Sequence, residues 1–223
     1  MIRVYYTQAA VENIDPSVLE AWMQARLERL PPAKRLQILR LRPLSSRFNS
    51  ILGWQLVEFA FRNSGYRHFK LSQLEFRDGR KPRWPDQSCD FNLSHSGSML
   101  ACALTADGLV GIDVEIIQPL RNQRMFRQVL ATGEPMPEPA GSNTFFQYWT
   151  RKEAVIKAAG IGGVWDMRLI RLNGVNAHYK NSDWHLYPLD ILPGYASCVA
   201  SNMGNQPIHT ETVAADRLIR DGG

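Results

Sequence analysis

The stretch VGIDVE, residues 110–115, predicts a β-strand that carries two carboxylates. Its other residues are β-branched or small and apolar, and side chains two apart on a strand emerge on the same face. Asp113 and Glu115 should therefore lie side by side. Alone, such a pair could be surface charge on an edge strand, so its meaning depends on what packs against it.

A second segment, WTRKEAVIKA at residues 149–158, predicts a helix. A spacing of four residues stacks Trp149, Glu153 and Lys157 along one stripe, while Lys152 projects from another part of the circumference. A third carboxylate and an ammonium group thus share a face. Carboxylate oxygens suit a hard cation such as Mg²⁺, which usually keeps waters and substrate phosphates as further ligands. The lysine in turn suggests a phosphate.

The composition predicts an ordered, soluble, globular protein. The 223 residues suffice for a full core, and 44% hydrophobic with 21% charged residues is far from a disordered composition. No apolar run approaches the roughly 18 residues of a membrane span, and the N-terminal residues lack a secretory signal. We therefore expect a cytoplasmic protein without a membrane partner. Cys89, Cys102 and Cys198 lack metal-ligand spacing and are expected as small core residues.

The formal net charge is +5, and the bias is local. The stretch at residues 26–47 contains only one acidic residue, Glu28, but seven basic residues: Arg26, Arg29, Lys34, Arg35, Arg40, Arg42 and Arg47. The stretch could be a solvated helix face, which charge runs usually are. It could also be a surface for phosphate or an acidic partner. Nucleic acid is not expected as a partner, because no aromatic residues interleave in a nucleic-acid-binding pattern.

Periodicity and turn residues predict a similar order of elements in both halves of the chain. The first half should contain strand 2–7, helix 16–30 with Asp15 and Pro16 at its start, helix 46–62, strand 71–76, a turn at 78–82, a hairpin of 91–93 with 99–105 around Ser94 to Gly97, and strand 110–117 continuing that sheet. The second half should contain an exposed loop at 131–144, helix 145–159 closed by Gly160, and strands 167–172, 184–188 and 196–201.

This repeated order of a helix, a short strand and a hairpin predicts an α+β fold of two similar lobes. We expect the lobes to comprise residues 1–108 and 109–223. The carboxylate strand would lie near their junction and the carboxylate helix in the second lobe. The active site is therefore expected in the cleft between the lobes, a frequent place for ligand pockets.

Four segments, taken in order, resemble the Sfp-type 4′-phosphopantetheinyl transferase family. They are Gly79-Arg80-Lys81-Pro82, Phe91-Asn92-Leu93-Ser94-His95-Ser96-Gly97, Gly111-Ile112-Asp113-Val114-Glu115, and Trp149-Thr150-Arg151-Lys152-Glu153 through Lys157. The resemblance spans roughly residues 79 to 160. It implies two pseudo-symmetric lobes in one chain, a monomer, and coenzyme A with Mg²⁺ in the cleft.

The resemblance also implies a reaction and roles for its residues. The 4′-phosphopantetheine arm of coenzyme A would pass to a serine hydroxyl of an apo carrier protein, and adenosine 3′,5′-bisphosphate would leave. Asp113, Glu115 and Glu153 match the metal-binding carboxylates of the family. Glu153, or a water that it orients, would take the serine proton, and the sequence does not separate these roles. Lys157 matches the catalytic lysine that faces the diphosphate.

Further residues match positions that hold coenzyme A in the family. His95 and Lys81 would meet the 3′-phosphate, Ser94 would line the nucleotide, and Lys34 would reach in from the first lobe. Arg47 stands for an arginine that precedes a Leu-Gly pair, although its six-residue offset from Gly53 is longer than the family pattern.

One motif departs from the family. Glu134 ends a Phe-x-x-x-Glu pattern in which Leu130 replaces the aromatic residue, and the sequence does not define its role.

The expected protein partner is an acidic apo acyl or peptidyl carrier protein. Carriers of fatty-acid, polyketide and nonribosomal-peptide synthesis all present a similar serine, so the sequence does not choose among them. Two other classes of function use the same residues. One is a Mg²⁺-dependent phosphohydrolase acting on a nucleotide, in which water attacks. The other is a non-catalytic binder of coenzyme A or an acidic protein, which would have little need for three carboxylates.

Overall fold

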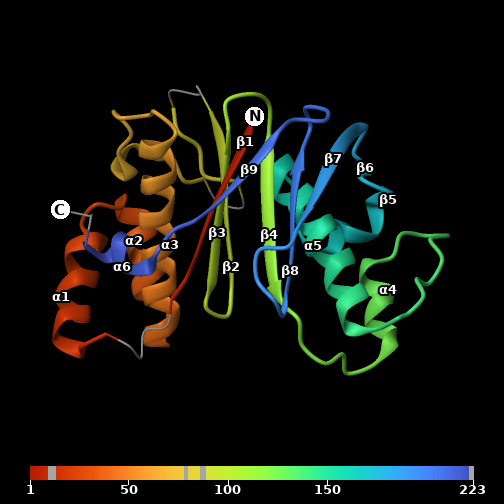
Figure 1. Cartoon of the computed structure of the whole chain (residues 1–223), viewed down its shortest axis with the longest axis horizontal. Helices are drawn as coiled ribbons and strands as arrows, with labels where there is room; N and C mark the ends of the chain where they lie inside the picture. Colours follow the sequence, from red (N-terminus) through yellow and green to blue (C-terminus); the bar gives the residue numbers. More distant parts are fainter. Residues whose placement is uncertain (10–13, 78–79, 86–88, 221–223) are drawn as a thin grey trace.

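The computed structural model describes residues 1–9, 14–77, 80–85 and 89–220. Two β-sheets meet in the middle of the molecule, and helices cover their outer sides (Figure 1). One sheet has the strand order β2-β3-β1-β9 and the other has β4-β8-β7-β6-β5. The predicted α+β fold is confirmed. No helix among these residues is both long and apolar enough to cross a lipid bilayer.

The first sheet and its helices draw on both ends of the chain. The strands are β1 (Ile2–Gln8), β2 (Asp90–Ser96), β3 (Met99–Thr105) and β9 (Ile208–Thr212). The helices are α1 (Pro16–Leu27), α2 (Pro32–Leu39), α3 (Leu44–Asn63), the 3₁₀ helix η2 (Leu71–Gln73) and α6 (Ala215–Arg220).

The second sheet and its helices come from one continuous stretch. The strands are β4 (Val110–Ile116), β5 (Arg171–Asn173), β6 (Asn176–Tyr179), β7 (Ser182–Leu189) and β8 (Tyr195–Ser201). The helices are η3 (Gln123–Met125), α4 (Phe126–Val129), α5 (Ser142–Ala159) and η4 (Val164–Leu169).

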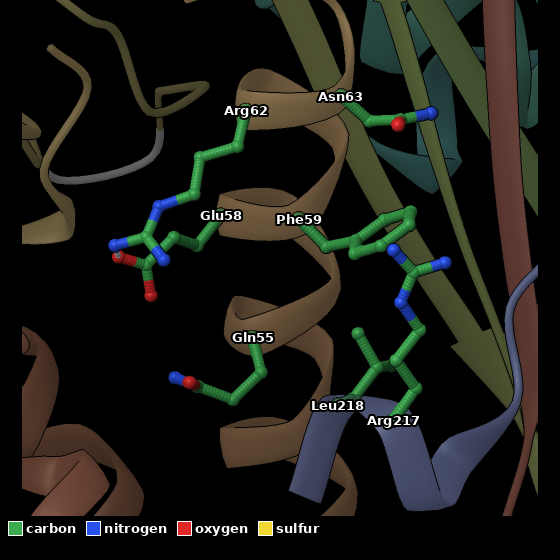
Figure 2. A pocket seen from close by; sticks show the side chains of 7 residues that line it. All are labelled: Gln55, Glu58, Phe59, Arg62, Asn63, Arg217 and Leu218. Carbon is green, nitrogen blue, oxygen red and sulfur yellow. Dashed lines mark hydrogen bonds and ion pairs between the residues drawn. The ribbon is translucent and has the colours of Figure 1, made fainter. Parts of the chain in front are cut away.

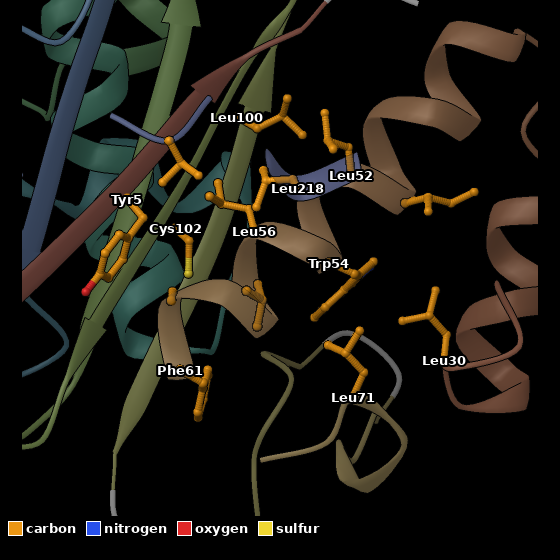
Figure 3. Close-up of a cluster of buried hydrophobic side chains, with 14 of the residues drawn as sticks. Tyr5, Leu30, Leu52, Trp54, Leu56, Phe61, Leu71, Leu100, Cys102 and Leu218 are labelled. Carbon is orange, nitrogen blue, oxygen red and sulfur yellow. The ribbon is translucent and has the colours of Figure 1, made fainter. Parts of the chain in front are cut away.

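Helix α3 is the centre of the first core, in which large apolar side chains of α3 meet the strands (Figure 3). Phe61 is fully buried and stacks on Phe69 with a centroid distance of 3.7 Å. It also makes edge contacts with Trp84 and Phe91. Removing such a ring typically costs about 3–5 kcal/mol, so this cluster anchors the first lobe.

A separate core lies between the two sheets and explains the orientation of β4. Val110, Ile112 and Val114 are fully buried there, against residues of the first sheet such as Ile2 and Val4. Because strand side chains alternate, the intervening residues of β4 must face the other way, toward α5. The predicted placement of two carboxylates on one face is thus confirmed.

Helix α5 lies directly on β4 because the strand has a glycine at the contact. A Cβ atom on Gly111 would be 2.1 Å from the carbonyl oxygen of Ala154 and 2.3 Å from the amide nitrogen of Ala158. Only glycine allows this approach of helix and strand. Gly160, with a φ of 64°, ends α5 in the left-handed conformation, as predicted.

Several predicted boundaries are confirmed. Asp15 caps α1, since its carboxylate accepts the amide of Val18 at 3.4 Å. Helix α1 ends at Leu27, three residues earlier than predicted. Cys102 and Cys198 are fully buried, as expected of small core residues. The part of the predicted turn at 78–79 lies outside the described residues.

Three strand predictions were wrong. Strand β4 does not continue the first sheet, because it pairs with β8. The predicted strand at 71–76 contains the 3₁₀ helix η2, and the beginning of 167–172 belongs to the 3₁₀ helix η4. In both, two apolar residues three apart are buried, a spacing that suits a 3₁₀ turn: Leu71 with Leu74, and Met167 with Ile170.

The hairpin turn is also shorter than predicted. Ser94, His95 and Ser96 belong to β2, and the register pairs Ser96 with Met99. A two-residue turn at Gly97 and Ser98 remains, with a φ of 57° at Gly97. The two serines therefore lie in regular strand geometry rather than in a loop.

The C-terminal segment returns to the first lobe. Strand β9 pairs in parallel with β1, and α6 packs on α3. The expected division at residue 108 thus separates the two sheets except for β9 and α6, which belong spatially with residues 1–108. Elements α2, η3, α4, β6, β9 and α6 have no counterpart in the sequence prediction.

Candidate active site

The three predicted carboxylates and Lys157 meet where β4 faces α5. Asp113 is 1% exposed, and its Oδ1 accepts hydrogen bonds from Lys157 Nζ at 2.7 Å and from Ser94 Oγ at 3.0 Å. Its Oδ2 is also buried but has no hydrogen-bond partner. The ammonium therefore neutralises one edge of a buried carboxylate whose other edge stays unsatisfied.

The other two carboxylates are half-buried. Glu115 accepts a hydrogen bond at Oε2 from Ser96 Oγ at 2.7 Å. Glu153 comes from α5, and its buried Oε2 has no hydrogen-bond partner. Buried carboxylate oxygens without a partner are rare in native proteins because each costs free energy. Two of them in one site indicate a missing positive charge or donor.

All three carboxylates have a raised pKa. Burial is the main cause at Asp113, where the ammonium of Lys157 opposes it. Burial is also the main cause that raises the pKa of Glu115. The hydrogen bond from Ser96 lowers this pKa, and the negative charge of Asp113 raises it further. For Glu153, burial is joined by repulsion from Asp113 and Glu115, while Lys157 acts in the opposite direction. The carboxylates repel one another, so they share one site.

The donor set fits Mg²⁺ in its chemistry. Among the described residues, no group of three or more His, Cys, Asp or Glu side chains is already arranged to hold a metal ion. The unsatisfied oxygens of Asp113 and Glu153 and the raised pKa of all three carboxylates are nevertheless what a divalent cation would relieve.

The β2–β4 seam holds the carboxylate strand in place. We use this name for four hydrogen bonds in which side chains of β2 accept backbone amides of β4. They are Asp90 Oδ2 from Val110 at 2.7 Å, Asn92 Oδ1 from Ile112 at 3.0 Å, Ser94 Oγ from Val114 at 3.3 Å and Ser96 Oγ from Ile116 at 3.1 Å. The constant offset of 20 residues shows that the strands run parallel.

A pocket of about 230 Å³ opens beside this site on the first lobe. Lys34 and His95 line it, and the Lys34 ammonium lies 5.4 Å from the ring centre of Trp54. Packing around the His95 ring lowers its pKa, and the charges of Lys157 and Lys34 lower it further. The structure thus brings Lys34, His95 and Lys157 close enough to influence one another. These are groups that the resemblance assigned to binding the phosphates of coenzyme A.

The same family emerges from comparison with known proteins. The model of the 4′-phosphopantetheinyl transferase superfamily matches residues 109–192. A Haemophilus influenzae protein, provisionally named a 4′-phosphopantetheinyl transferase, is 30% identical over 178 residues, which cover 72% of this chain and 71% of that protein. The chain belongs to the 4′-phosphopantetheinyl transferase superfamily.

Two further members of the superfamily match the chain over different lengths, one over less than half of it and one over most of it. The 4′-phosphopantetheinyl transferase AcpT of Escherichia coli K12 is 36% identical over 104 residues, which cover 44% of this chain and 53% of AcpT. The match thus spans about half the length of AcpT. The 4′-phosphopantetheinyl transferase Sfp of Bacillus subtilis 168 is 25% identical over 206 residues, which cover 85% of this chain and 90% of Sfp.

Two residues that the superfamily motifs single out lie elsewhere. Lys81 is largely but not fully buried, donates to Asp90 and to the Val110 carbonyl oxygen at 2.6 Å, and lines a different pocket from His95. Burial lowers the pKa of Lys81, while Asp90 opposes this. The Arg47 guanidinium donates to the Leu41 carbonyl oxygen at 2.6 Å. In this arrangement both cations are engaged by the protein itself.

Sequence reasoning missed other residues around the site. Asn49 of α3 donates to the Gly97 carbonyl oxygen at 3.0 Å and so ties α3 to the turn between β2 and β3. Asn92 and Ser96 belong to the β2–β4 seam. Their signal was the alternation of polar residues at 90, 92, 94 and 96 in a strand whose ladder partner, β3, is almost entirely apolar.

Lys152 has a structural role that its motif position did not reveal. It is fully buried and donates to Glu134 Oε2 at 2.8 Å and to the Val129 carbonyl oxygen at 2.5 Å. Glu134 also accepts the Ala131 amide at 2.6 Å. The pair therefore fastens the start of the loop that precedes α5, residues 131–141, to that helix. The loop is three residues shorter than predicted, because α5 begins at Ser142. This assigns a contact to Glu134, and it confirms that Lys152 stands apart from the stripe of Glu153 and Lys157.

A separate pocket of about 290 Å³ lies between α3 and α6 (Figure 2). Its buried acid Glu58 is bridged by Arg29 and by Arg62 at 2.8 Å. The Arg217 guanidinium lies 4.7 Å from the ring centre of Phe59. None of its lining residues belongs to the carboxylate site, so this pocket has no part in the chemistry above.

The Lys152–Glu134 pair yields a prediction about stability. Lys152→Met leaves Glu134 largely buried without its cation, which should lower the free energy of unfolding by about 3 kcal/mol. Adding Glu134→Gln removes the orphaned charge but keeps an acceptor for the Ala131 amide, so the double variant should recover most of the loss. Chemical denaturation of both variants measures this, and equal losses would contradict the assigned pairing.

Proposed function

We propose that the protein transfers the 4′-phosphopantetheine group of coenzyme A to a serine hydroxyl of an apo carrier protein, in a reaction that requires Mg²⁺. The observation that carries the proposal is the meeting of Asp113, Glu115, Glu153 and Lys157 in one partly buried site, with unsatisfied carboxylate oxygens. Membership in the superfamily supports the same reaction.

The bond changes of this phosphoryl transfer are simple. The serine oxygen forms a bond to the phosphorus that carries the pantetheine group. The bond from that phosphorus to the oxygen bridging the diphosphate breaks, and adenosine 3′,5′-bisphosphate leaves with the electron pair. The serine proton passes to a base. Such reactions are accelerated mainly by positioning and by neutralising charge on the transferred group.

Residues of α5 would carry the proton and charge movements. Glu153, or a water that it orients, accepts the serine proton, and its raised pKa brings it nearer to the pH at which a general base works well. The Lys157 ammonium donates hydrogen bonds to Asp113 and Ser94. When coenzyme A is bound, this ammonium would stabilise the charge that develops on the diphosphate.

Asp113, Glu115 and Glu153 would hold the cation. A bound Mg²⁺ supplies charge neutralisation and orientation at the diphosphate oxygens. Holding it would satisfy the orphaned oxygens of Asp113 and Glu153 and reduce the repulsion among the three carboxylates.

Coenzyme A would lie along the pocket of Lys34 and His95, with Ser94 beside the nucleotide. The Lys34 ammonium packs on the rings of Trp54 and Phe76, which shield it partly from solvent. This burial lowers its pKa. A phosphate would favour the protonated, charged form of both Lys34 and His95. Lys81 and Arg47 remain proposed contacts of the 3′-phosphate, which each would reach only after leaving its present partner.

The proposed acceptor is an acidic acyl or peptidyl carrier protein, since the net charge of +5 favours an acidic partner. The proposal assigns the reaction to a monomer in the cytoplasm. The identity of the carrier depends on surface recognition outside the carboxylate site.

Intact-mass measurement tests the transfer. With Mg²⁺ and coenzyme A, the protein should increase the mass of an apo carrier by one phosphopantetheine group. Asp113→Ala and Glu153→Ala should each reduce the rate by more than about 100-fold, because each removes a direct ligand of the cation. Leu169→Ala, at an exposed residue of η4, serves as the control.

Two results would contradict the proposal. One is no mass change on any of a panel of fatty-acid, polyketide and peptide carriers. The other is phosphate release from nucleotides at the same rate with and without a carrier, which would favour the phosphohydrolase. Wild-type rates in both carboxylate variants would refute the metal assignment alone.

The raised pKa values predict how Mg²⁺ and pH act together. In the metal-free protein, the folded carboxylates bind protons more tightly than the unfolded ones, so the free energy of unfolding should fall as pH rises from the ordinary carboxylate pKa to the raised value. Mg²⁺ competes with those protons. Its stabilising effect should therefore be large at pH 8 and shrink toward about pH 5.

Thermal unfolding with and without Mg²⁺ across this pH range measures the effect. Glu153→Gln removes one repelling charge, so its Tm without Mg²⁺ at pH 8 should equal or exceed the wild-type value, by up to about 3 °C. Its gain from Mg²⁺ should be smaller. A wild-type gain from Mg²⁺ that is the same at both ends of the range would show that these carboxylates do not bind the cation.

A further inference from the structure

The polar residues of β2 match the carboxylates of β4 in spacing. Ser94 donates its hydroxyl proton to Asp113, and Ser96 donates its own to Glu115. Both pairs are separated by 19 residues. Because strand side chains repeat every two residues, a Ser-x-Ser sequence on one strand can serve an Asp-x-Glu sequence on its neighbour only in a single register.

The hydrogen bonds of Ser96 fix which way its hydroxyl points. A serine hydroxyl has one proton to donate and two lone pairs to accept with. The amide of Ile116 donates to Ser96 Oγ at 3.1 Å, so a lone pair is used on the side of the β4 backbone. The proton is directed to Glu115 Oε2 at 2.7 Å. The backbone of β4 thus orients the hydroxyl that holds the carboxylate of β4.

Ser94 and Ser96 differ in what else they touch. Ser94 Oγ accepts from both Lys157 Nζ at 2.9 Å and the Val114 amide, so it belongs to the network of the ammonium. Within the described part of the chain, both hydrogen-bond partners of Ser96 Oγ belong to β4. Its hydroxyl therefore acts on one carboxylate, and that carboxylate lies near the end of the strand.

Glu115 needs such a restraint more than Asp113 does. Asp113 has a short side chain, is almost completely buried, and is held by Lys157. Glu115 has a longer side chain, is only half-buried, and is repelled by the charge of Asp113. Without Ser96, repulsion and conformational freedom both favour turning the Glu115 carboxylate out toward solvent.

We propose that Ser96 is a positioning residue of the cation site, which holds Glu115 beside Asp113 through a hydroxyl oriented by the Ile116 amide. The inference rests on the function proposed above, because it concerns the same carboxylates. Partners that orient a metal ligand typically contribute 10–100-fold to metal affinity. Ser96 should contribute at the lower end of this range, since its partner is half-exposed.

The test measures cation affinity directly, in the absence of coenzyme A and carrier protein. Mn²⁺ is the probe, and electron paramagnetic resonance counts the free ion during a titration. Ser96→Ala should weaken Mn²⁺ binding about 10-fold. Ser96→Thr keeps the hydroxyl and should restore binding to within about twofold of the wild type.

Ser98→Ala is the matched control. Ser98 lies in the same hairpin, and its hydroxyl accepts from Gln8 at 3.2 Å rather than contacting a carboxylate. It should bind Mn²⁺ like the wild type. The Tm of each variant without metal shows whether a change in affinity reflects loss of folded protein.

A double-mutant cycle separates positioning of Glu115 from a general effect on β4. If Ser96 acts through Glu115, Ser96→Ala should add nothing to the loss of Mn²⁺ affinity already caused by Glu115→Ala. A further loss in the double variant would show that Ser96 acts through the strand backbone and would overturn the inference.

Two other results would overturn it as well. Wild-type affinity in Ser96→Ala would show that the hydroxyl is dispensable while leaving the proposed function intact. Failure of Ser96→Thr to restore binding in a folded protein would show that the hydroxyl is not the responsible group. Absence of Mn²⁺ binding by the wild type is a different outcome, since it contradicts the proposed cation site itself and the inference with it.

Discussion

The structure depends on the β2–β4 seam, where side chains take the place of a backbone ladder. Strands β2 and β4 lie at the edges of their sheets, so each would otherwise present unpaired backbone groups. A buried amide without a partner costs about 1–3 kcal/mol. Four such amides of β4 are satisfied by Asp90, Asn92, Ser94 and Ser96, which joins the two sheets without merging them.

The seam determines where the chemistry lies. Because β4 presents its apolar residues to the core between the sheets, Asp113 and Glu115 face α5. Gly111 lets α5 approach closely enough for Lys157 to reach Asp113 at 2.7 Å. The polar atoms that satisfy the seam are also those that hold the carboxylates. Assembly of the lobes and assembly of the site are therefore one event, and a change that loosens the seam should disturb both.

The sequence predicted which side chains meet better than it predicted the topology, for physical reasons. Asp113, Glu115, Glu153 and Lys157 follow from strand and helix periodicity, which local residues control. The sheet to which β4 belongs depends on Ser94 and Ser96 intercepting its amides, a tertiary choice that strand patterns do not encode. Strand β9 and helix α6 were missed because their short, mostly polar sequences are stabilised by β1 and α3, which are distant in sequence.

Not every residue of the superfamily motifs lies where its motif position suggests. Asp113, Glu115 and Glu153 share one site, whereas Lys81 and Arg47 are engaged in contacts of their own. Lys152 is adjacent to Glu153 in sequence, but it binds Glu134 and the Val129 carbonyl oxygen instead. Neighbouring residues on a helix point in different directions. Position in a motif therefore predicts function only together with the face of the element that carries the residue.

Amide hydrogen exchange of β4, followed residue by residue by NMR, tests the central role of the seam most directly. The amides of Val110, Ile112, Val114 and Ile116 face the edge of their sheet, yet they should exchange as slowly as amides within a backbone ladder. Ser94→Ala should accelerate exchange at Val114 first. Rapid exchange of all four amides in the wild type would show that the seam is not formed and would contradict the account.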